Sequence, residues 1–168
     1  LYVFDEQGRH LRTEDTHTGQ VKFSFGYVNY EVATDKFEDL LVEIRDKRGS
    51  TAPEYDFVTE ITRSSNGTPT SIVAPYGQTT SLTLTDGYLT TVAFPSSLGS
   101  YTLGYASSDN GLLEELIDPK GGTHSYEYTA DGRLWKDRDP ATPSPNAAFR
   151  TLTRAHSFVN QVQTTTVS

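Results

Sequence analysis

Histidines and paired carboxylates are the residues of this 168-residue chain whose types and spacing could carry out chemistry. His10 and His17 lie close in sequence to two acidic residues, Glu14 and Asp15, and this set suggests a metal or acid–base site. The spacing of the two histidines matches no standard arrangement of zinc ligands. We therefore expect solvated turn residues here, with no metal and no cofactor. His124 precedes two alternating tyrosines and is expected to pack with them.

Two carboxylate pairs, Glu114/Glu115 and Asp137/Asp139, could serve a glycosidase, which needs two carboxylates across a cleft. Both pairs flank predicted turns, where acidic residues are common for structural reasons. The sequence contains no G-x-S-x-G, no H-E-x-x-H, no phosphate-binding glycine loop and no dinucleotide fingerprint. We predict no catalytic residue and keep a carboxylate hydrolase only as a residual alternative.

Composition excludes further classes of function. The net charge of −8, with no basic patch, argues against nucleic-acid binding. The absence of cysteine excludes disulfides, thiolate metal sites and a cysteine nucleophile. No apolar run approaches the length of a membrane span. The chain starts at Leu1 and has no methionine, so we expect a processed or excised piece of a longer protein.

The segment Gly111–Leu134 shows how these residues would be positioned, because it has the pattern strand, turn, strand, turn. Breakers at Pro119–Gly122 and Asp131-Gly132 mark the turns. Between them, alternation with a period of two places His124, Tyr126 and Tyr128 on one face of a strand. The other face carries Thr123, Ser125, Glu127 and Thr129.

Copies of this unit recur about every 20–24 residues from Gly67 onward, which is typical of a repeat protein. One series of glycines precedes aliphatic strands: Gly67, Gly87, Gly111 and Gly132. A second series marks the mid-repeat turns: Gly77, Gly99 and Gly122. Three of these turns contain proline: Pro75, Pro95 and Pro119. After them come strands with an alternating apolar face, which includes Tyr101 and Tyr105.

The remaining segments also favour strands and very little helix. Alternating residues predict strands within Leu1–Gly26, Leu40–Asp46 and Ala52–Arg63, with Pro53 near the start or on an edge, and strand-like sequence returns over 149–168. Turns are predicted at Glu6–Gly8, Thr16–Gly19, Lys47–Ser50 and Ser64–Gly67, where Asn66-Gly67 suits a tight hairpin. Tyr27–Asp39 is irregular: an eroded repeat, a loop or a short helix, of which a loop or irregular strand is favoured. Residues 140–148 form a predicted proline-rich loop.

These motifs resemble those of the Rhs/YD-repeat family. Tyr126–Leu134, YEYTADGRL, resembles the Y-x-Y-D-x-x-G-R-L signature, and Gly111-Leu-Leu with Ile117–Gly121 matches its G-L-L…D-P-x-G half. Residues 1–27 and Ala74–Leu89 look like parts of the YD shell of teneurins and their bacterial relatives. Two positions depart from the pattern: Thr129 replaces the Asp of the YD pair, and Phe94 stands where Asp or Asn usually precedes Pro.

The resemblance implies an architecture of consecutive antiparallel β-hairpins that form a curved, spiralling sheet, so that residues 1–168 would be a single YD-repeat region and an arc of a larger β-shell. It also implies a secreted or cell-surface bacterial protein whose shell can enclose a C-terminal toxin domain. The partners would be the remainder of the parent shell and, through open sheet edges, other copies of the chain. The positions that would define the repeat are Tyr101, Tyr105, Gly111, Pro119, Gly122, Tyr126, Tyr128, Asp131 and Gly132.

Two functions stay open for the tyrosine-rich face. The regular spacing of Tyr101, Tyr105, Tyr126 and Tyr128 favours cross-strand packing in a non-enzymatic scaffold. The alternative is an adhesion module that binds glycan or a partner protein through exposed rings.

Overall fold

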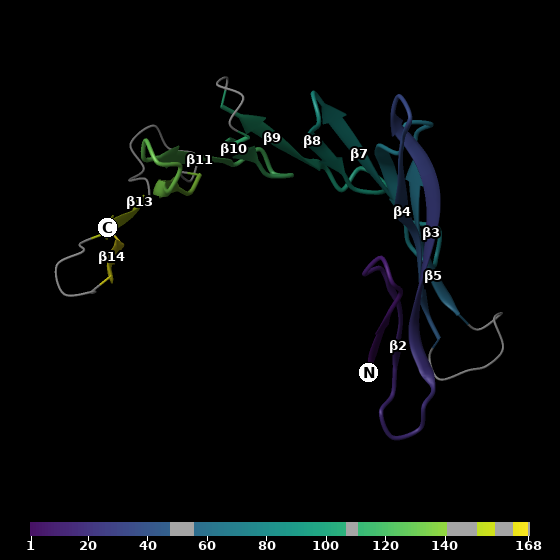
Figure 1. Ribbon diagram of the computed structural model, residues 1–168. Helices are drawn as coiled ribbons and strands as arrows, with labels where there is room; N and C mark the ends of the chain where they lie inside the picture. The colour runs from purple at the N-terminus through teal and green to yellow at the C-terminus, as the bar shows by residue number, and fades with distance from the viewer. Residues whose placement is uncertain (48–55, 107–110, 141–150, 157–162, 168) are drawn as a thin grey trace. The chain divides into compact units, whose positions relative to one another are not determined.

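The computed structural model describes residues 1–47, 56–106, 111–140, 151–156 and 163–167, with no side chains described after residue 140 (Figure 1). These residues form strands and turns and contain no helix, which confirms the all-β prediction. A helix able to cross a membrane is accordingly not found in this part of the chain. Three predicted features lie mainly outside the described residues: the turn at Lys47–Ser50, the start of Ala52–Arg63 and the loop at 140–148.

Residues 1–82 form one compact unit. Its strands are β1 (Tyr2–Phe4), β2 (His10–Glu14), β3 (Val21–Ala33), β4 (Lys36–Asp46), β5 (Phe57–Arg63), β6 (Pro69–Val73) and the first residues of β7 (Thr79–Thr85). Each strand pairs antiparallel with the next strand of the chain. The unit is therefore a run of antiparallel hairpins, which confirms the architecture that the family resemblance implies.

Residues 83–168 form a second compact unit with the same arrangement. After the end of β7 it contains β8 (Tyr88–Ala93), β9 (Ser100–Tyr105), β10 (Leu113–Ile117), β11 (Thr123–Tyr128), β12 (Leu134–Arg138), β13 (Thr151–His156) and β14 (Gln163–Val167). From β8 onward every neighbouring pair is antiparallel and follows chain order. Such a sheet grows by adding one hairpin after another.

One five-residue turn recurs between the strands. Its first residue donates its backbone N–H to the carbonyl of the fifth, and a glycine at the fourth position donates to the carbonyl of the first. The glycine has a φ of 77–83°, a left-handed conformation that side chains disfavour. This is a three-residue hairpin loop closed by a glycine bulge. The turns begin at Asp5, Ser64, Ala74, Asp118 and Thr129.

This geometry corrects two details of the sequence analysis. The series of Gly77 continues at Gly121 (φ 83°), whereas we had assigned it to Gly122. Asn66-Gly67 belongs to the five-residue turn, and the tight two-residue hairpin is formed instead by Asp86 (φ 52°) and Gly87 (φ 82°). Both central residues of that tight turn have positive φ, as a type I′ turn requires.

Residues 27–39, which we expected to be irregular, lie in the long β3–β4 hairpin and are neither a loop nor a helix. The register shifts between Gly26 and Tyr27 and again between Glu31 and Ala33, so β3 is an irregular strand with two breaks in its ladder. The hairpin reverses between paired residues Ala33 and Lys36, where Asp35 has a φ of 57°. A non-glycine turn residue explains why no breaker marked this turn.

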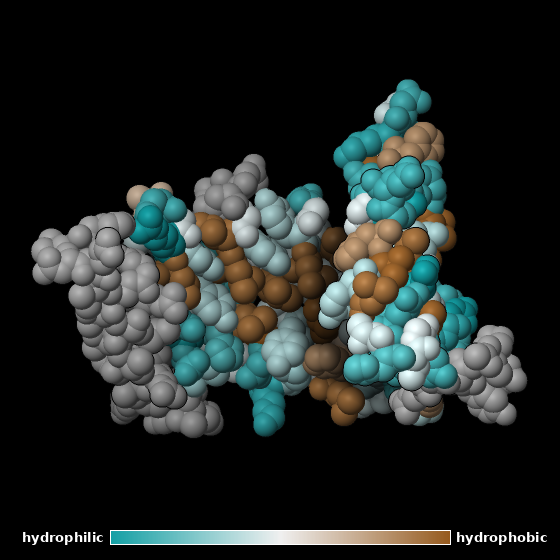
Figure 2. Space-filling view, turned by 60° about the horizontal axis from the view of Figure 1, so that its bottom comes forward, coloured by the Kyte–Doolittle hydropathy of each residue, from teal (hydrophilic) through white to brown (hydrophobic). Residues whose placement is uncertain are grey.

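The described residues contain no fully buried hydrophobic side chain. Most apolar side chains on the strands are half-buried, and some are largely open, such as Tyr2 at 68% and Tyr76 at 75%. Brown apolar and teal polar residues are accordingly intermixed on the surface in Figure 2. The strands are therefore held by backbone ladders and half-buried contacts, and no enclosed core is found in the part of the chain that is described.

Candidate functional site

Three tyrosines brace the sheet through their hydroxyl groups. Each donates a hydrogen bond to a backbone carbonyl of the preceding strand: Tyr27 to His10 at 3.1 Å, Tyr105 to Leu89 at 2.8 Å and Tyr128 to Leu113 at 2.7 Å. A buried or half-buried tyrosine usually finds such a partner, because its hydroxyl would otherwise lose solvation. The recurrence of this contact in both compact units gives these tyrosines a structural role.

The tyrosines of β8 and β9 also make ring contacts. The Tyr88 and Tyr105 ring centroids are 5.0 Å apart, and Tyr101 meets Phe94 edge-on at 5.8 Å. Gly111 (φ 68°) lies against Tyr88, because a Cβ there would be 3.1 Å from the Cε1 atom of that ring. These distances are typical of stabilising aromatic pairs. The departure at Phe94 therefore adds a ring contact where the family pattern has a polar residue.

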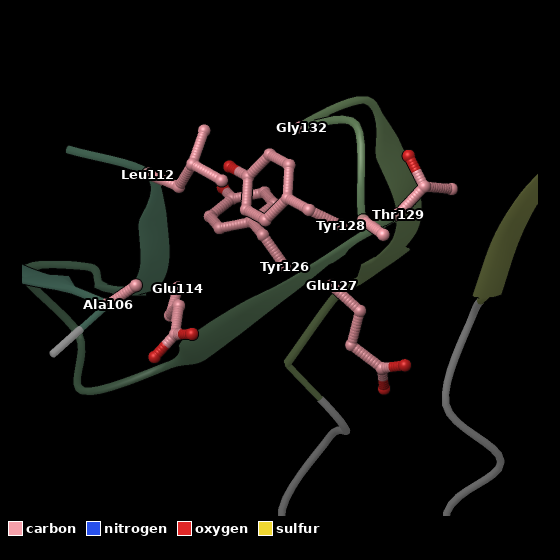
Figure 3. A pocket seen from close by; sticks show the side chains of 9 residues that line it. Ala106, Leu112, Glu114, Tyr126, Glu127, Tyr128, Thr129 and Gly132 are labelled. Carbon is pink, nitrogen blue, oxygen red and sulfur yellow. The ribbon is translucent and has the colours of Figure 1, made fainter. Parts of the chain in front are cut away.

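A cavity of about 620 Å³ opens where β10 and β11 meet the loops beside them (Figure 3). In Figure 3 the rings of Tyr126 and Tyr128 lie toward Leu112, whereas the Glu127 carboxylate points away from them. This volume falls within the range of ligand pockets. The lining residues are Ala106, Leu112, Glu114, Tyr126, Glu127, Tyr128, Thr129, Ala130 and Gly132.

Acidic residues surround the two phenols of this cavity. Tyr126 is the cross-strand partner of Asp137 on β12. Burial raises the pKa of Tyr126, and the neighbouring Asp137 raises it further. Burial likewise raises the pKa of Tyr128, with Glu114 as the next contribution. Negative charge near a phenol disfavours its ionisation, so both rings stay neutral at physiological pH.

The carboxylates near the cavity differ in how they are paired. Glu127 is bound by Lys136 at 2.8 Å and by Arg138 at 2.5 Å. The hydrogen bond from Lys136 is the main reason that the pKa of Glu127 lies below its usual value. Glu114 is exposed, and no cation forms an ion pair with it among the described residues. Within the described residues, the cavity lining therefore has one carboxylate that is paired with cations and one that is not.

The histidine predicted to lie in a turn near Glu14 is instead a ring-packing residue. His10 contacts Tyr2, Phe4 and Phe25 at centroid distances of 5.5, 5.0 and 4.3 Å. Its Nε2 atom lies 3.0 Å from the Arg12 carbonyl. The imidazole thus belongs to an aromatic cluster on β1–β3.

Asp15 and His17 do form a turn. Asp15 accepts backbone N–H bonds from His17 and Thr18 at 2.9 and 3.1 Å, and Lys22 pairs with it at 2.8 Å. The Lys22 contact, followed by those N–H bonds, lowers the pKa of Asp15. His124 lies 3.5 Å from Asp139. No group of histidine and acidic residues suited to a metal is found within the described ranges.

Glu114 and Asp137 are candidate residues in the sequence, but they belong to separate pairs there. Glu114 is paired with Glu115 and Asp137 with Asp139, because these residues are neighbours in the chain. The structure instead places Glu114 in the lining of the cavity with Tyr126 and Tyr128, and Asp137 opposite Tyr126 in the sheet. Glu114 lies on β10 and Asp137 on β12, on either side of β11, and their proximity depends on a strand register that the sequence alone does not specify.

Comparison with known proteins agrees with the hairpin repeat. The family profile described as "Teneurin YD-shell" matches residues 1–163. Teneurin-3 of Danio rerio is 33% identical over 135 residues, and Teneurin-4 of Mus musculus is 29% identical over 141 residues. Each alignment covers 80% of this chain and 4% of the relative, so the chain spans a small part of the curated relatives that it matches. The chain belongs to the teneurin YD-shell family.

Proposed function

We propose that this chain is a non-enzymatic segment of the wall of a YD shell. The observation that carries the proposal is the recurrence of one turn and one tyrosine brace along strands paired in chain order. A repeated backbone motif extends the sheet by one unit after another, whereas a catalytic site requires a single specific arrangement of side chains. The curved, spiralling form of the complete sheet is part of this proposal and follows from the family resemblance.

The burial pattern supports a wall that is completed by further chain. The described residues bury no hydrophobic side chain fully. Aromatic rings such as those of Tyr2 and Phe4 are more than half exposed. Contiguous exposed apolar surface is stabilised when another protein surface covers it. We propose the remainder of the parent shell as that cover, with self-association through open strand edges when the chain is isolated.

The location and contents of the shell are proposals from the resemblance alone. The parent protein would be exported, as a secreted or cell-surface protein, and its shell would enclose a C-terminal domain, of the toxin type in a bacterial parent. The relatives reported above are from zebrafish and mouse, so a bacterial origin stays a prediction.

Light scattering after size-exclusion chromatography, over a series of concentrations, tests the wall proposal. We expect dimers or larger species that grow with concentration, because unpaired strand edges pair with other copies. A compact monomer at every concentration would favour a self-contained binding domain. A variant with Lys in place of Val3 on β1 provides a second arm, since a charge on an edge strand opposes such pairing.

The adhesion alternative receives less support from the geometry. Tyr105 and Tyr128 use their hydroxyl groups in the sheet, and Tyr101 packs against Phe94. A glycan array tests this alternative directly. Dose-dependent binding that is lost in Tyr126→Ala or Tyr101→Ala would favour adhesion over the wall.

A further inference from the structure

We propose that the cavity beside Tyr126 and Tyr128 binds an organic cation, a guanidinium or ammonium group carried on an alkyl chain. The proposal does not depend on the shell function. It rests on three features of the same cavity: its size, its two neutral phenol rings and its excess of carboxylate over cationic groups. Apolar lining from Leu112, Ala106 and Ala130 would accept the alkyl chain.

The rings supply the first attraction. A guanidinium or ammonium group is attracted to the face of a tyrosine, and the attraction increases where water is partly excluded. Tyr126 and Tyr128 are both half-buried and both line the cavity. The Tyr128 hydroxyl is already bound to Leu113, but no hydrogen bond of the Tyr126 hydroxyl is found among the described residues. In the part of the chain that is described, Tyr126 is therefore the ring whose hydroxyl has no hydrogen-bond partner.

The carboxylates supply the second attraction and the selectivity for charge. Glu114 lines the cavity without an ion-pair partner among the described residues, and Asp137 is opposite Tyr126 in the sheet. The nearby cations Lys136 and Arg138 are both bound to Glu127. A ligand cation would consequently meet a negative field that the described part of the protein does not neutralise. A neutral sugar would gain no such electrostatic attraction.

The test is a chemical-shift titration of the full chain with labelled tyrosine rings, in which Tyr126→Phe assigns the Tyr126 signal. N-acetyl-arginine methylamide is compared with its citrulline analogue, which has nearly the same shape and no charge. We expect binding of about millimolar affinity, with about fivefold preference for the arginine compound. Equal binding of both compounds, or no shift with either, would overturn the proposal.

Variants separate the two attractions. Glu114→Gln is expected to weaken arginine binding about threefold, whereas Glu115→Gln, the same change one residue along and outside the lining, should leave it unaltered. Tyr126→Leu should weaken arginine binding and reduce the preference for the charged compound, because Glu114 remains, and Tyr126→Phe should keep most of both. Circular dichroism confirms that each variant is folded. Equal effects of Glu114→Gln and Glu115→Gln would show that net charge, and not this cavity, attracts the cation.

One further probe, butylguanidinium, identifies the source of the cation. It carries the isolated group, whereas N-acetyl-arginine methylamide presents the group as a peptide side chain. Tighter binding of the peptide compound supports a protein-borne arginine, and equal binding supports a small free cation. Binding of N-acetylglucosamine at the same site, with no response to either cation, would refute the proposal in favour of glycan adhesion.

Discussion

Two turns on either side of β11 have the same backbone and different first residues. In the turn 118–122, the Asp118 carboxylate accepts N–H bonds from Lys120 and Gly122 at 2.7 and 2.9 Å. In the turn 129–133, the Thr129 hydroxyl accepts one N–H bond, from Arg133 at 3.1 Å, and donates to Asp131. The first turn is closed by one carboxylate, and the second by a hydroxyl and a carboxylate two residues later.

This comparison explains how the turn 129–133 forms although Thr129 stands where the resemblance places Asp. The left-handed glycine and the two backbone hydrogen bonds are the same in both turns. The side chain at the first position adds to a turn that the backbone already defines, and Ala74 begins a turn of the same kind with no polar side chain. The glycine should therefore matter most and the first residue less, which the following substitutions test.

Replacing the left-handed glycine should have the largest effect in either turn. Gly132 has a φ of 77° and open space around its missing Cβ, so strain alone sets the cost. We expect Gly132→Val to lower the free energy of unfolding by about 2 kcal/mol, because a β-branched residue disfavours positive φ. Urea unfolding followed by the fluorescence of Trp135, the single tryptophan, would measure it.

Gly121→Val should cost about as much, since Gly121 has a φ of 83° and equally open surroundings. Gly132→Asn is the control, because asparagine tolerates the left-handed region better than valine does. An unchanged stability in Gly132→Val would contradict the hairpin assignment of this turn.

The fifth position should show the next largest difference between the turns. Gly122 is packed tightly: a Cβ there would lie 2.7 Å from Asp118 Oδ2 and 3.0 Å from Pro140. We expect Gly122→Ala to cost about 1 kcal/mol through overpacking. Arg133→Ala, at the equivalent position, should change stability by less than about 0.5 kcal/mol, since it removes only an exposed ion pair with Asp131. Equal effects in urea unfolding would show that the close approach of Pro140 is not maintained.

The contrast between Gly121 and Gly122 also marks a limit of the sequence analysis. The period located the turn between β10 and β11, but two adjacent glycines gave no means of deciding which one is left-handed. The turn of the β3–β4 hairpin was missed for the opposite reason, because Asp35 takes a positive φ where no glycine is present. Local composition predicts that a turn occurs more reliably than it predicts which residue carries the strain.

The candidate site was harder to predict than the fold. Alternation predicts that tyrosines share one face of a strand, but it does not predict the hydroxyl bonds of Tyr105 and Tyr128, which depend on distances between strands. Glu114, which lines the cavity with Tyr128, lies at a register shift between Leu113 and Glu115 in the pairing of β9 with β10. A bulge redirects side chains locally, and no pattern in the sequence of β10 marks it.

The residue at the first position should give the two turns a different dependence of stability on pH. Backbone N–H bonds from Gly122 and Lys120 lower the pKa of Asp118. A carboxyl with a lowered folded-state pKa contributes stability above its unfolded pKa of about 4, and this contribution is lost as the pH falls through the folded value. We expect Asp118→Asn to be less stable than wild type at pH 6 and to approach it at low pH.

Urea midpoints measured from pH 6 downward would follow this difference. Ser64→Ala, at the first position of the turn 64–68, is the control, because the Ser64 hydroxyl donates to the Asn66 amide oxygen and the Thr68 carbonyl, and neither group titrates over this range. A constant difference between wild type and Asp118→Asn at every pH would show that the carboxylate charge does not stabilise the turn.

Restoring the family's aspartate at Thr129 should have the smallest effect. A carboxylate at position 129 could accept the N–H of Arg133, as Asp118 accepts that of Gly122. It would also lose the donated bond to Asp131 and place a like charge beside that residue. Because these contributions oppose each other at an exposed turn, we expect Thr129→Asp to change the free energy of unfolding by less than about 0.5 kcal/mol. Combining it with Asp131→Asn removes the repulsion, so the double variant should be more stable than Thr129→Asp alone. If Thr129→Asp by itself stabilised the chain strongly, the hydroxyl and Asp131 could not be the equivalent of the Asp118 carboxylate.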